Sequence, residues 1–315
     1  MEQQTIKKIA TRDSYGKALA ELGALHEDIV VLDADLAGAT KTVTFQKAFP
    51  DRHFDCGIAE ANMMCVAAGL ATTGLVPFAS SFAMFAAGRA YEQVRNSIGY
   101  PHLNVKIGAT HGGISVGEDG ASHQCCEDFA LMRSIPGMVV MSPSDDVEAR
   151  AMVKAAYAHQ GPVYMRFGRS AVPVIHPEGF EFQIGKGEIL RDGTDVAIIA
   201  NGLMVYEALV AAQALIEDGI STMVINMATI KPLDADLVVS AAKTCGKIVT
   251  CEEHSIFGGL GEAVSACLGE NYPVPMRRIG VHDVFGHSGS AGELLKQFGL
   301  CAAHIEETVR QLCGR

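Results

Sequence analysis

The sequence lacks an apolar run long enough to cross a membrane. Its longest apolar stretch extends from Met63 to Ala71 and ends at Thr72 and Thr73, whereas a spanning helix needs about 20 such residues. The N-terminal residues MEQQTIKKIATRD also lack the apolar segment of a secretory signal. We therefore expect a protein that neither spans a membrane nor is exported.

The sequence also lacks the cysteine spacing of metal and redox sites. Its nine cysteines are odd in number and include no C-x-x-C pair. Cys125 and Cys126 are adjacent, which is poor geometry for a mutual disulfide. This pattern predicts reduced thiols and a cytoplasmic location.

Positive charge is scarce, since 25 lysines and arginines stand against 36 aspartates and glutamates and leave a net charge of -11. A field of this sign disfavours nucleic acid or an anionic membrane as the main partner. An anionic substrate would therefore need a local group of basic residues. With 49% apolar and 19% charged residues, the 315-residue chain has the composition of a compact soluble protein and the length of two domains.

What is present is an alternation of short apolar strands with helical periodicity, which is typical of parallel sheets covered by helices on both faces. We expect an α/β fold with two doubly wound domains. Helices are predicted over Ser14–Leu25, Glu60–Thr73, Phe82–Ile98, Asp145–His159, Val205–Asp218, Ala235–Thr244 and from Gly258–Gly261 to Leu268. Strands are predicted over Ile29–Asp33, Val76–Ala79, Val105–Gly108, Met138–Met141, Pro162–Phe167, Asp195–Ala200, Ser221–Ile225 and Lys247–Thr250.

One segment interrupts this alternation. Ser170–Phe182 contains Pro173, Pro177 and Gly179 and shows no clear periodicity, as is typical of a linker. We expect a first domain over residues 1–170, a linker over 171–187 and a second domain over 188–315.

A carboxylate, Glu60, follows a strand and begins an otherwise apolar helix. A lone glutamate at this place usually does no more than favour the helix dipole. Phe82 and Phe85 follow on the next predicted helix, where residues three apart share one face. A pair of phenylalanines is more often plain core, but a ring face beside a buried carboxylate suits a flat heteroaromatic ligand with a basic nitrogen.

A third segment, Thr110–Gln124, is a long glycine-rich loop that carries two histidines and two carboxylates between strands. Polar loops that follow a buried strand are often functional. A solvated surface loop is the plainer interpretation, but His111 and His123 are both flanked by small residues. A metal site is a competing interpretation, although the spacing matches no zinc pattern.

These segments, in this order, resemble the transketolase family over almost the whole chain. The similar motifs are Lys8–Arg12, Ala34–Ala37, Gly57–Glu60, Gly117–Gln124, Glu252–His254 and Phe285–Gly289. The resemblance implies a pyrimidine-binding domain for thiamine diphosphate, followed by a transketolase-type C-terminal domain. The GIAEAN and GEDGxxHQ segments are specific, whereas the C-terminal motifs are shared more widely among thiamine-dependent relatives.

The resemblance also implies roles for individual residues. Glu60 corresponds to the carboxylate that hydrogen-bonds the pyrimidine ring nitrogen, and Phe82 and Phe85 to the aromatic residues that stack on that ring. Asp35 corresponds to an aspartate near the cofactor. The remaining residues bind substrate: His111, Asp119 and His123 along the substrate channel, and Arg12 and Arg169 at the substrate phosphate. Catalytic roles are implied for Glu60, His111 and His123.

The chemistry explains why a carboxylic acid is needed at Glu60. A protonated glutamate donates to the pyrimidine nitrogen and favours the imino tautomer of the cofactor, whose imino nitrogen then removes the thiazolium C2 proton. Burial among apolar residues favours the neutral, protonated form of a carboxyl group. The cofactor serves as the electron sink, while the protein supplies orientation and electrostatics.

A metal site for the cofactor is missing from this chain. Family members hold Mg²⁺ or Ca²⁺ with a Gly-Asp-Gly segment and a following Asn, and no Gly-Asp-Gly occurs here. The resemblance therefore implies the C-terminal subunit of a split transketolase, which acts on sugar phosphates. The diphosphate and the metal would be held by an N-terminal partner subunit in an α2β2 heterotetramer.

Three positions depart from the family pattern. Gly88 stands where many transketolases have an aromatic residue, Ala39 where they often have a phosphate-binding serine, and Gly112 where an acidic residue is usual. We expect that these changes bear on ring stacking, anion binding and substrate preference.

Three alternatives share parts of this pattern. The beta subunit of a 2-oxo-acid dehydrogenase has a similar length and domain pair, but it is not expected to carry Gly117–Gly120 with His123, or Arg12 with Arg169. Deoxyxylulose-phosphate synthase carries both halves in one chain. A non-catalytic regulatory subunit is disfavoured because Glu60 and the anion-binding residues are retained.

Overall fold

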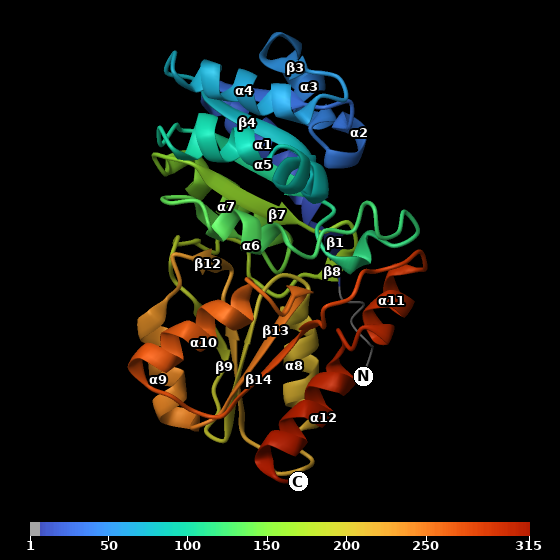
Figure 1. Cartoon of the computed structure of the whole chain (residues 1–315), viewed down its shortest axis with the longest axis vertical. Coiled ribbons are helices and arrows are strands. Elements are labelled where there is room, and N and C mark those ends of the chain that lie inside the picture. The colour runs from blue at the N-terminus through green and yellow to red at the C-terminus, as the bar shows by residue number, and fades with distance from the viewer. Residues whose placement is uncertain (1–6) are drawn as a thin grey trace. The chain divides into compact units, whose positions relative to one another are not determined.

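The computed structural model describes residues 7–315, so part of the predicted signal-free N-terminus, residues 1–6, lies outside the described residues. The chain divides into two compact units. Unit 1 runs to Gly112 and also includes Ile135–Met138 and Asp145–Gln183. Unit 2 comprises Gly113–Ser134, Val139–Ser144 and Ile184–Arg315. Each is an α/β unit built on a largely parallel sheet, as predicted (Figure 1).

The strands that unit 1 contributes to its main sheet are all parallel. Its strands are ordered β7 (Val163–Phe167), β5 (Lys106–Thr110), β4 (Val76–Phe82), β2 (Ile29–Asp33) and β3 (His53–Asp55). Every residue of β2, β4, β5 and β7 is buried. This explains their nearly continuous apolar sequences, because both faces of a parallel sheet are covered by helices.

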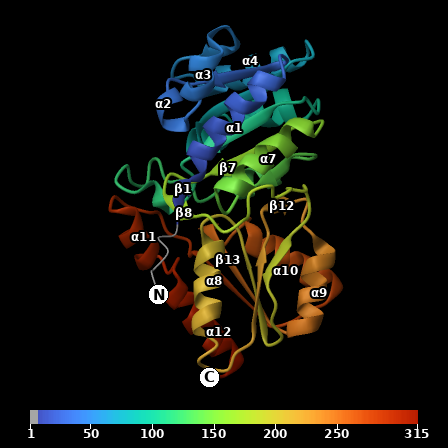
Figure 2. The same cartoon turned by 180° about the vertical axis from the view of Figure 1, so that it is seen from behind.

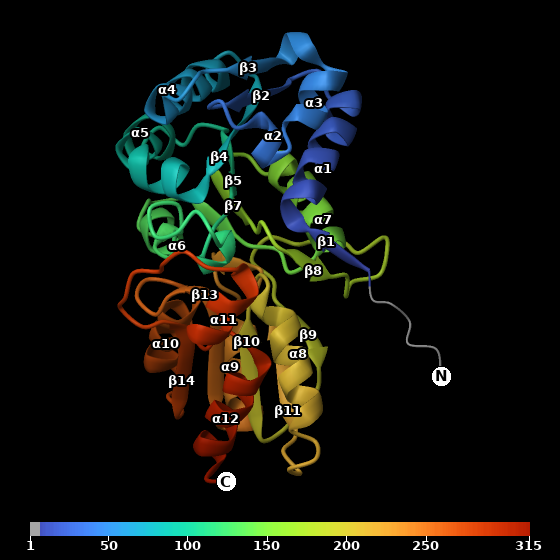
Figure 3. The ribbon, with the colours of Figure 1, turned by 90° about the vertical axis from the view of Figure 1, so that its right-hand side faces the viewer.

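Helices cover both faces of this sheet (Figure 3). On one face α1 (Thr11–Leu25) packs against α3 (Val43–Ala48) and α7 (Asp146–Ala158). On the other, α4 (Glu60–Ala71) packs against α5 (Tyr91–Gln93) and the π-helical segment η3 (Val94–Gly99). The shorter elements of the unit are α2 (Ala37–Thr40), η1 (Pro50–Arg52), η2 (Met84–Arg89), β1 (Lys8–Ala10) and β8 (Ala171–Pro173).

One predicted element of unit 1 needs correction. The helix predicted from Phe82 to Ile98 begins only at Met84, because β4 continues to Phe82, and it is broken into the π-helical η2, the short α5 and η3. Within the segment predicted as a linker, β8 pairs antiparallel with β1. That pairing joins residues far apart in the sequence, so local periodicity could not indicate it.

Unit 2 has a five-stranded sheet ordered β14 (Met276–Val281), β13 (Ile248–Ser255), β10 (Val196–Ala200), β11 (Thr222–Asn226) and β9 (Glu188–Arg191). All neighbours are parallel except β9, an antiparallel edge strand. In the same unit β6 (Val139–Met141) pairs antiparallel with β12 (Thr229–Lys231).

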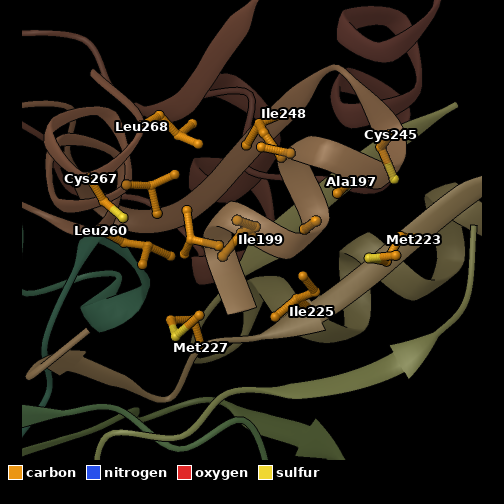
Figure 4. Packing of buried hydrophobic residues seen from close by; sticks show 14 residues of the cluster. Ala197, Ile199, Met223, Ile225, Met227, Cys245, Ile248, Leu260, Cys267 and Leu268 are labelled. Atoms are coloured by element: carbon orange, nitrogen blue, oxygen red, sulfur yellow. The ribbon is translucent and has the colours of Figure 1, made fainter. Parts of the chain in front are cut away.

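The helices of unit 2 pack in two pairs, α8 (Met204–Ala214) with α12 (Ala302–Cys313) and α9 (Ala235–Cys245) with α10 (Leu260–Asn271) (Figure 2). Side chains of the strands and of the second pair form an apolar core, in which Ile199, Ile225 and Leu260 are completely buried (Figure 4). The short helices α6 (Asp128–Arg133), α11 (Ala291–Gln297) and the 3-10 turn η4 (Ile114–Val116) complete the unit. No helix within residues 7–315 is long and apolar enough to cross a membrane.

Candidate active site

The predicted site residues of unit 1 gather where strands end. Glu60 follows β3, Phe82 closes β4, His111 follows β5 and Arg169 follows β7. The carboxyl ends of parallel strands share one edge of a sheet, and open α/β sheets bind ligands outside that edge. The candidate site of this unit is therefore its carboxyl edge, where Arg12, in the first turn of α1, joins these residues.

Glu60 is the first residue of α4 and only 1% exposed. Arg89 donates through one nitrogen to both of its carboxylate oxygens, at 3.1 and 2.9 Å. The Arg89 side chain is half-exposed, and its guanidinium lies 4.4 Å from the centre of the Phe85 ring. The sequence analysis missed Arg89. Its position four residues after Phe85 was the available signal.

Three aromatic rings stack beside this ion pair. The rings of Phe82 and His111 stack with centroids 3.9 Å apart and an interplanar angle of 27°. Phe82 and Phe85 stack at 5.8 Å and 14°. The two phenylalanine rings do face one another, but not as residues of one helix, because Phe82 ends β4 and Phe85 lies in η2. The strand-to-helix turn produces the stack.

The hydrogen bonds of His111 determine its tautomer. Nε2 lies 2.9 Å from an Arg12 nitrogen, and arginine can only donate, so Nε2 accepts. A neutral imidazole then carries its proton on Nδ1, which donates to Oγ1 of Thr110 at 2.8 Å. His111 is buried and has a left-handed backbone with φ 58°. Its ring is thus held in one orientation by two side chains and by Phe82.

Two cations influence one another at this edge. Burial lowers the pKa of the Arg12 guanidinium, Asp13 opposes that shift, and the charge of Arg169 lowers the pKa further. Arg12 also donates to the carbonyl of Ala39 at 3.2 Å. A site that keeps two guanidinium groups close enough to repel is suited to an anion, because a bound anion relieves the repulsion.

A buried aspartate missed by the sequence analysis shapes the turn after β2. Asp33 accepts from the hydroxyls of Thr40 at 2.8 Å and Thr42 at 2.9 Å, and from the backbone N–H of Leu36. Burial raises the pKa of Asp33, and these hydrogen bonds oppose the rise. The turn leaves Asp35 exposed at φ 60°, with its N–H donating to Asp55 Oδ1 at 3.0 Å.

Asp119 and His123 belong to unit 2 rather than to unit 1. Asp119 is exposed, and His123 is half-buried with Nδ1 3.0 Å from the Ser122 hydroxyl. The predicted set is therefore divided: the residues expected at the cofactor, together with His111 and both arginines, lie in unit 1, and the other two channel residues lie in unit 2.

The structure gives a physical reason for one of the two unusual glycines. A Cβ at Gly112 would collide with the buried side chain of Arg166, so the usual acidic residue has no room there. A Cβ at Gly88 would meet only the flexible end of Met84. Over residues 7–315, no group of three or more His, Cys, Asp or Glu side chains is placed to hold a metal ion.

Comparisons with known proteins identify two families along the chain. Residues 7–174 match the family described as transketolase, pyrimidine binding domain, and residues 185–305 match transketolase, C-terminal domain.

Individual proteins are similar over nearly their whole length. A Methanocaldococcus jannaschii protein with the provisional name transketolase C-terminal section is 51% identical and covers 95% of each chain. The 6-deoxy-6-sulfo-D-fructose transketolase subunit SqwH of a Clostridium species is 44% identical, over 96% of this chain and 94% of that protein. A solved structure described as a split gene transketolase, inactive beta4 tetramer, matches with a TM-score of 0.91 and 52% identity, over 97% of this chain and 99% of that chain.

Proposed function

Since the chain belongs to the transketolase family, we propose that it is one subunit of a split, thiamine-diphosphate-dependent transketolase. Together with an N-terminal partner subunit it would transfer a two-carbon ketol unit from a ketose to an aldose. The observation that carries the proposal is the buried carboxylate of Glu60 at the start of α4, beside the stacked rings of Phe82 and Phe85. The domain boundaries at residues 170 and 188 remain predictions.

The described residues fit the pyrimidine half of this cofactor. Glu60 would hold the ring nitrogen, Phe82 and Phe85 would offer ring faces, and the exposed Asp35 would lie near the cofactor. When bound, thiamine diphosphate supplies an electron sink for breaking the carbon–carbon bond. The diphosphate and its Mg²⁺ or Ca²⁺ are assigned to the partner subunit, because this chain has no Gly-Asp-Gly segment.

Arg89 and the pyrimidine ring would compete for the same oxygens of Glu60. Arg89 donates to both carboxyl oxygens of Glu60. A ring nitrogen placed against one oxygen would replace one of these bonds. The Arg89 guanidinium, which lies over the Phe85 ring, can move outward because the Arg89 side chain is half-exposed.

The sugar is expected to bind by its hydroxyls and by its terminal anion. His111 presents a neutral imidazole whose Nε2 is polarised by Arg12, and we assign to His111, Asp119 and His123 the contacts along the substrate channel. Arg12 and Arg169 would bind the terminal anion. Guanidinium groups bind oxyanions through two parallel hydrogen bonds. This chemistry accepts a phosphate, and also a sulfonate of the kind named for the Clostridium relative.

Assembly and activity test this function directly. The related beta4 tetramer is described as inactive, so we expect this chain alone to be inactive as well. Light scattering of the chain co-expressed with a diphosphate-binding subunit should give two copies of each chain, and ketol transfer should appear only in that mixture. A fully active homomer of this chain would refute the proposal, and oxidative decarboxylation of a 2-oxo acid by the mixture would favour the dehydrogenase alternative.

A further inference from the structure

The segment Gly113–Ser134 lies within the part of the chain that matches the pyrimidine-binding family, yet it packs as part of unit 2. The last residues of β13 bind this segment. The Ser115 N–H donates to Glu253 Oε1 at 2.6 Å, the Ala130 N–H to His254 Nε2 at 3.4 Å, and the Ser255 N–H to the carbonyl of Cys126 at 2.7 Å. The loop that carries Asp119 and His123 is therefore built on the C-terminal domain.

This segment binds at the carboxyl edge of the sheet, where open α/β sheets normally bind ligands. The carboxyl end of the inner strand β13 consists of Glu253, His254 and Ser255. In unit 2 this edge is occupied by the chain itself, and the His254 ring stacks on Phe129 of α6 at 4.9 Å. Glu253 is only 6% exposed. The backbone approaches it so closely that a Cβ at Gly113, where φ is +81°, would collide with the Glu253 carboxyl.

The other end of the loop is held by Gln124. Its buried amide nitrogen donates to the carbonyls of Ile114 at 3.1 Å and His287 at 3.0 Å. Gly286 packs so closely on the Gln124 amide that it has no room for a side chain. A Cβ at Gly120 would lie 2.6 Å from the Ser288 hydroxyl. Thus the segment around His287 and Ser288 closes over the loop.

From these contacts we infer that Glu253 and Gln124 are positioning residues, through which the C-terminal domain determines how Asp119 and His123 meet the sugar. The inference rests on the proposed function, because that function makes the two loop residues substrate contacts. The loop contains left-handed glycines at Gly113, Gly117 and Gly120, and such a backbone is mobile unless its ends are held. The proposed cofactor residues, Glu60, Phe82 and Phe85, lie in unit 1 and take no part in these bonds.

Matched variants separate positioning from folding. Glu253→Leu removes the acceptor for the Ser115 N–H, whereas Glu253→Gln keeps an amide oxygen that can accept. Gln124→Met removes the hydrogen bonds donated by the amide, including those to Ile114 and His287, at nearly the same side-chain size. Glu252→Gln is the control, because the neighbouring Glu252 accepts from Leu260 and Gly261 at the start of α10 and approaches the segment indirectly, through His254, whose Nδ1 lies 3.8 Å away. Glu252→Gln should lower Tm and leave the exchange of residues 113–124 unchanged.

The first measurement needs no activity. In amide hydrogen exchange on the full-length chain, we expect peptides covering residues 113–124 to exchange about tenfold faster in Glu253→Leu and Gln124→Met than in wild type. Glu253→Gln and Glu252→Gln should leave these peptides unchanged, and so should peptides from β4 and α4 in every variant. Unchanged exchange of the loop in both Glu253→Leu and Gln124→Met, or equal acceleration throughout unit 2, would overturn the inference.

The second measurement uses the chain assembled with its diphosphate-binding partner subunit. Glu253→Leu and Gln124→Met should raise KM for the donor ketose about tenfold while kcat changes less than about threefold. The Kd of thiamine diphosphate should not change. If the wild type is active and the variants keep a normal KM, this inference is refuted but the proposed function is not. A wild type without ketol transfer would defeat the proposed function, and hydrogen exchange would still decide whether Glu253 and Gln124 hold the loop.

Discussion

The two units of this chain use the same edge of a parallel sheet in different ways. In unit 1 the strand ends carry Glu60, Phe82 and His111, the residues that we propose bind a ligand. In unit 2 the end of β13 presents Glu253 and His254 to a loop and a helix of the same chain. The ligand-binding edge of a doubly wound sheet is thus a general docking edge. Buried polar side chains at this edge indicate that something binds there. They do not indicate whether it is a substrate or another part of the protein.

Substitution of the buried Glu60 should give the largest effect on activity. We expect Glu60→Gln to lower kcat by about 100-fold or more while assembly and Tm are kept, because an amide cannot alternate between acid and carboxylate. Steady-state ketol transfer and circular dichroism would measure this. In contrast, Glu252→Gln should reduce the free energy of unfolding by about 1.5–3 kcal/mol through loss of a charged hydrogen bond, with normal kcat per folded enzyme. Near-normal turnover of Glu60→Gln would mean that Glu60 is only a helix-start residue.

Asp145 is a buried aspartate of unit 1 that lies outside the candidate site. Its contribution to stability should depend on pH, which distinguishes a structural carboxylate from one that binds a ligand. Asp145 caps α7 and also accepts from the backbone N–H groups of Ile175 and His176. Burial alone would raise its pKa, but hydrogen bonds from the His176 side chain and from backbone N–H groups, with the charge of His176, leave the pKa of Asp145 below its ordinary value.

The lowered pKa of Asp145 determines how the free energy of unfolding changes with pH. A lowered folded-state pKa adds stability above the unfolded value of about 3.9, and this stability is lost as pH falls through the folded-state pKa. We expect Asp145→Asn to reduce the free energy of unfolding at pH 7 by about 2 kcal/mol. The difference from wild type should shrink toward pH 2 in urea titrations. A difference that is equal at pH 7 and pH 2 would assign the effect to the cap alone.

Anion binding in unit 1 should give a smaller, substrate-dependent effect. Arg169→Ala should raise KM for a phosphorylated acceptor about tenfold, equivalent to about 1.4 kcal/mol, because one guanidinium is lost from the anion. Glyceraldehyde, which lacks the phosphate, should be nearly unaffected. Equal losses for both acceptors would show that Arg169 supports the fold or a subunit contact.

The smallest effect is expected at Gly88. Since only the flexible end of Met84 lies in the way, Gly88→Ala should change the free energy of unfolding by less than about 1 kcal/mol. Gly112→Ala should cost about 1–3 kcal/mol, because the buried Arg166 cannot move as easily. Thermal unfolding of both variants measures the contrast, and a Gly88 variant as unstable as the Gly112 variant would show that Met84 is fixed.

The sequence by itself determined the alternation of the inner strands with their main helices, the place of Glu60 at the start of α4, and the family. It did not indicate the edge strands β9 and β14 or the last helix α12. Apolar periodicity and helix-start residues are local properties, so they can be recognised without knowing the partners in space. The helix predicted from Phe82 was wrong at its start because β4 extends to that residue and the following helix contains π-helical turns.

Only the tertiary structure decided which side chains meet. Arg89 pairs with Glu60 from 29 residues away, Arg12 determines the tautomer of His111 from 99 residues away, and Glu253 binds Ser115 from 138 residues away. Such pairs depend on how parallel strands are ordered and on which loop fills a sheet edge. The physical reason is that hydrogen bonding and burial act through space, whereas sequence periodicity reports only on neighbours along the chain.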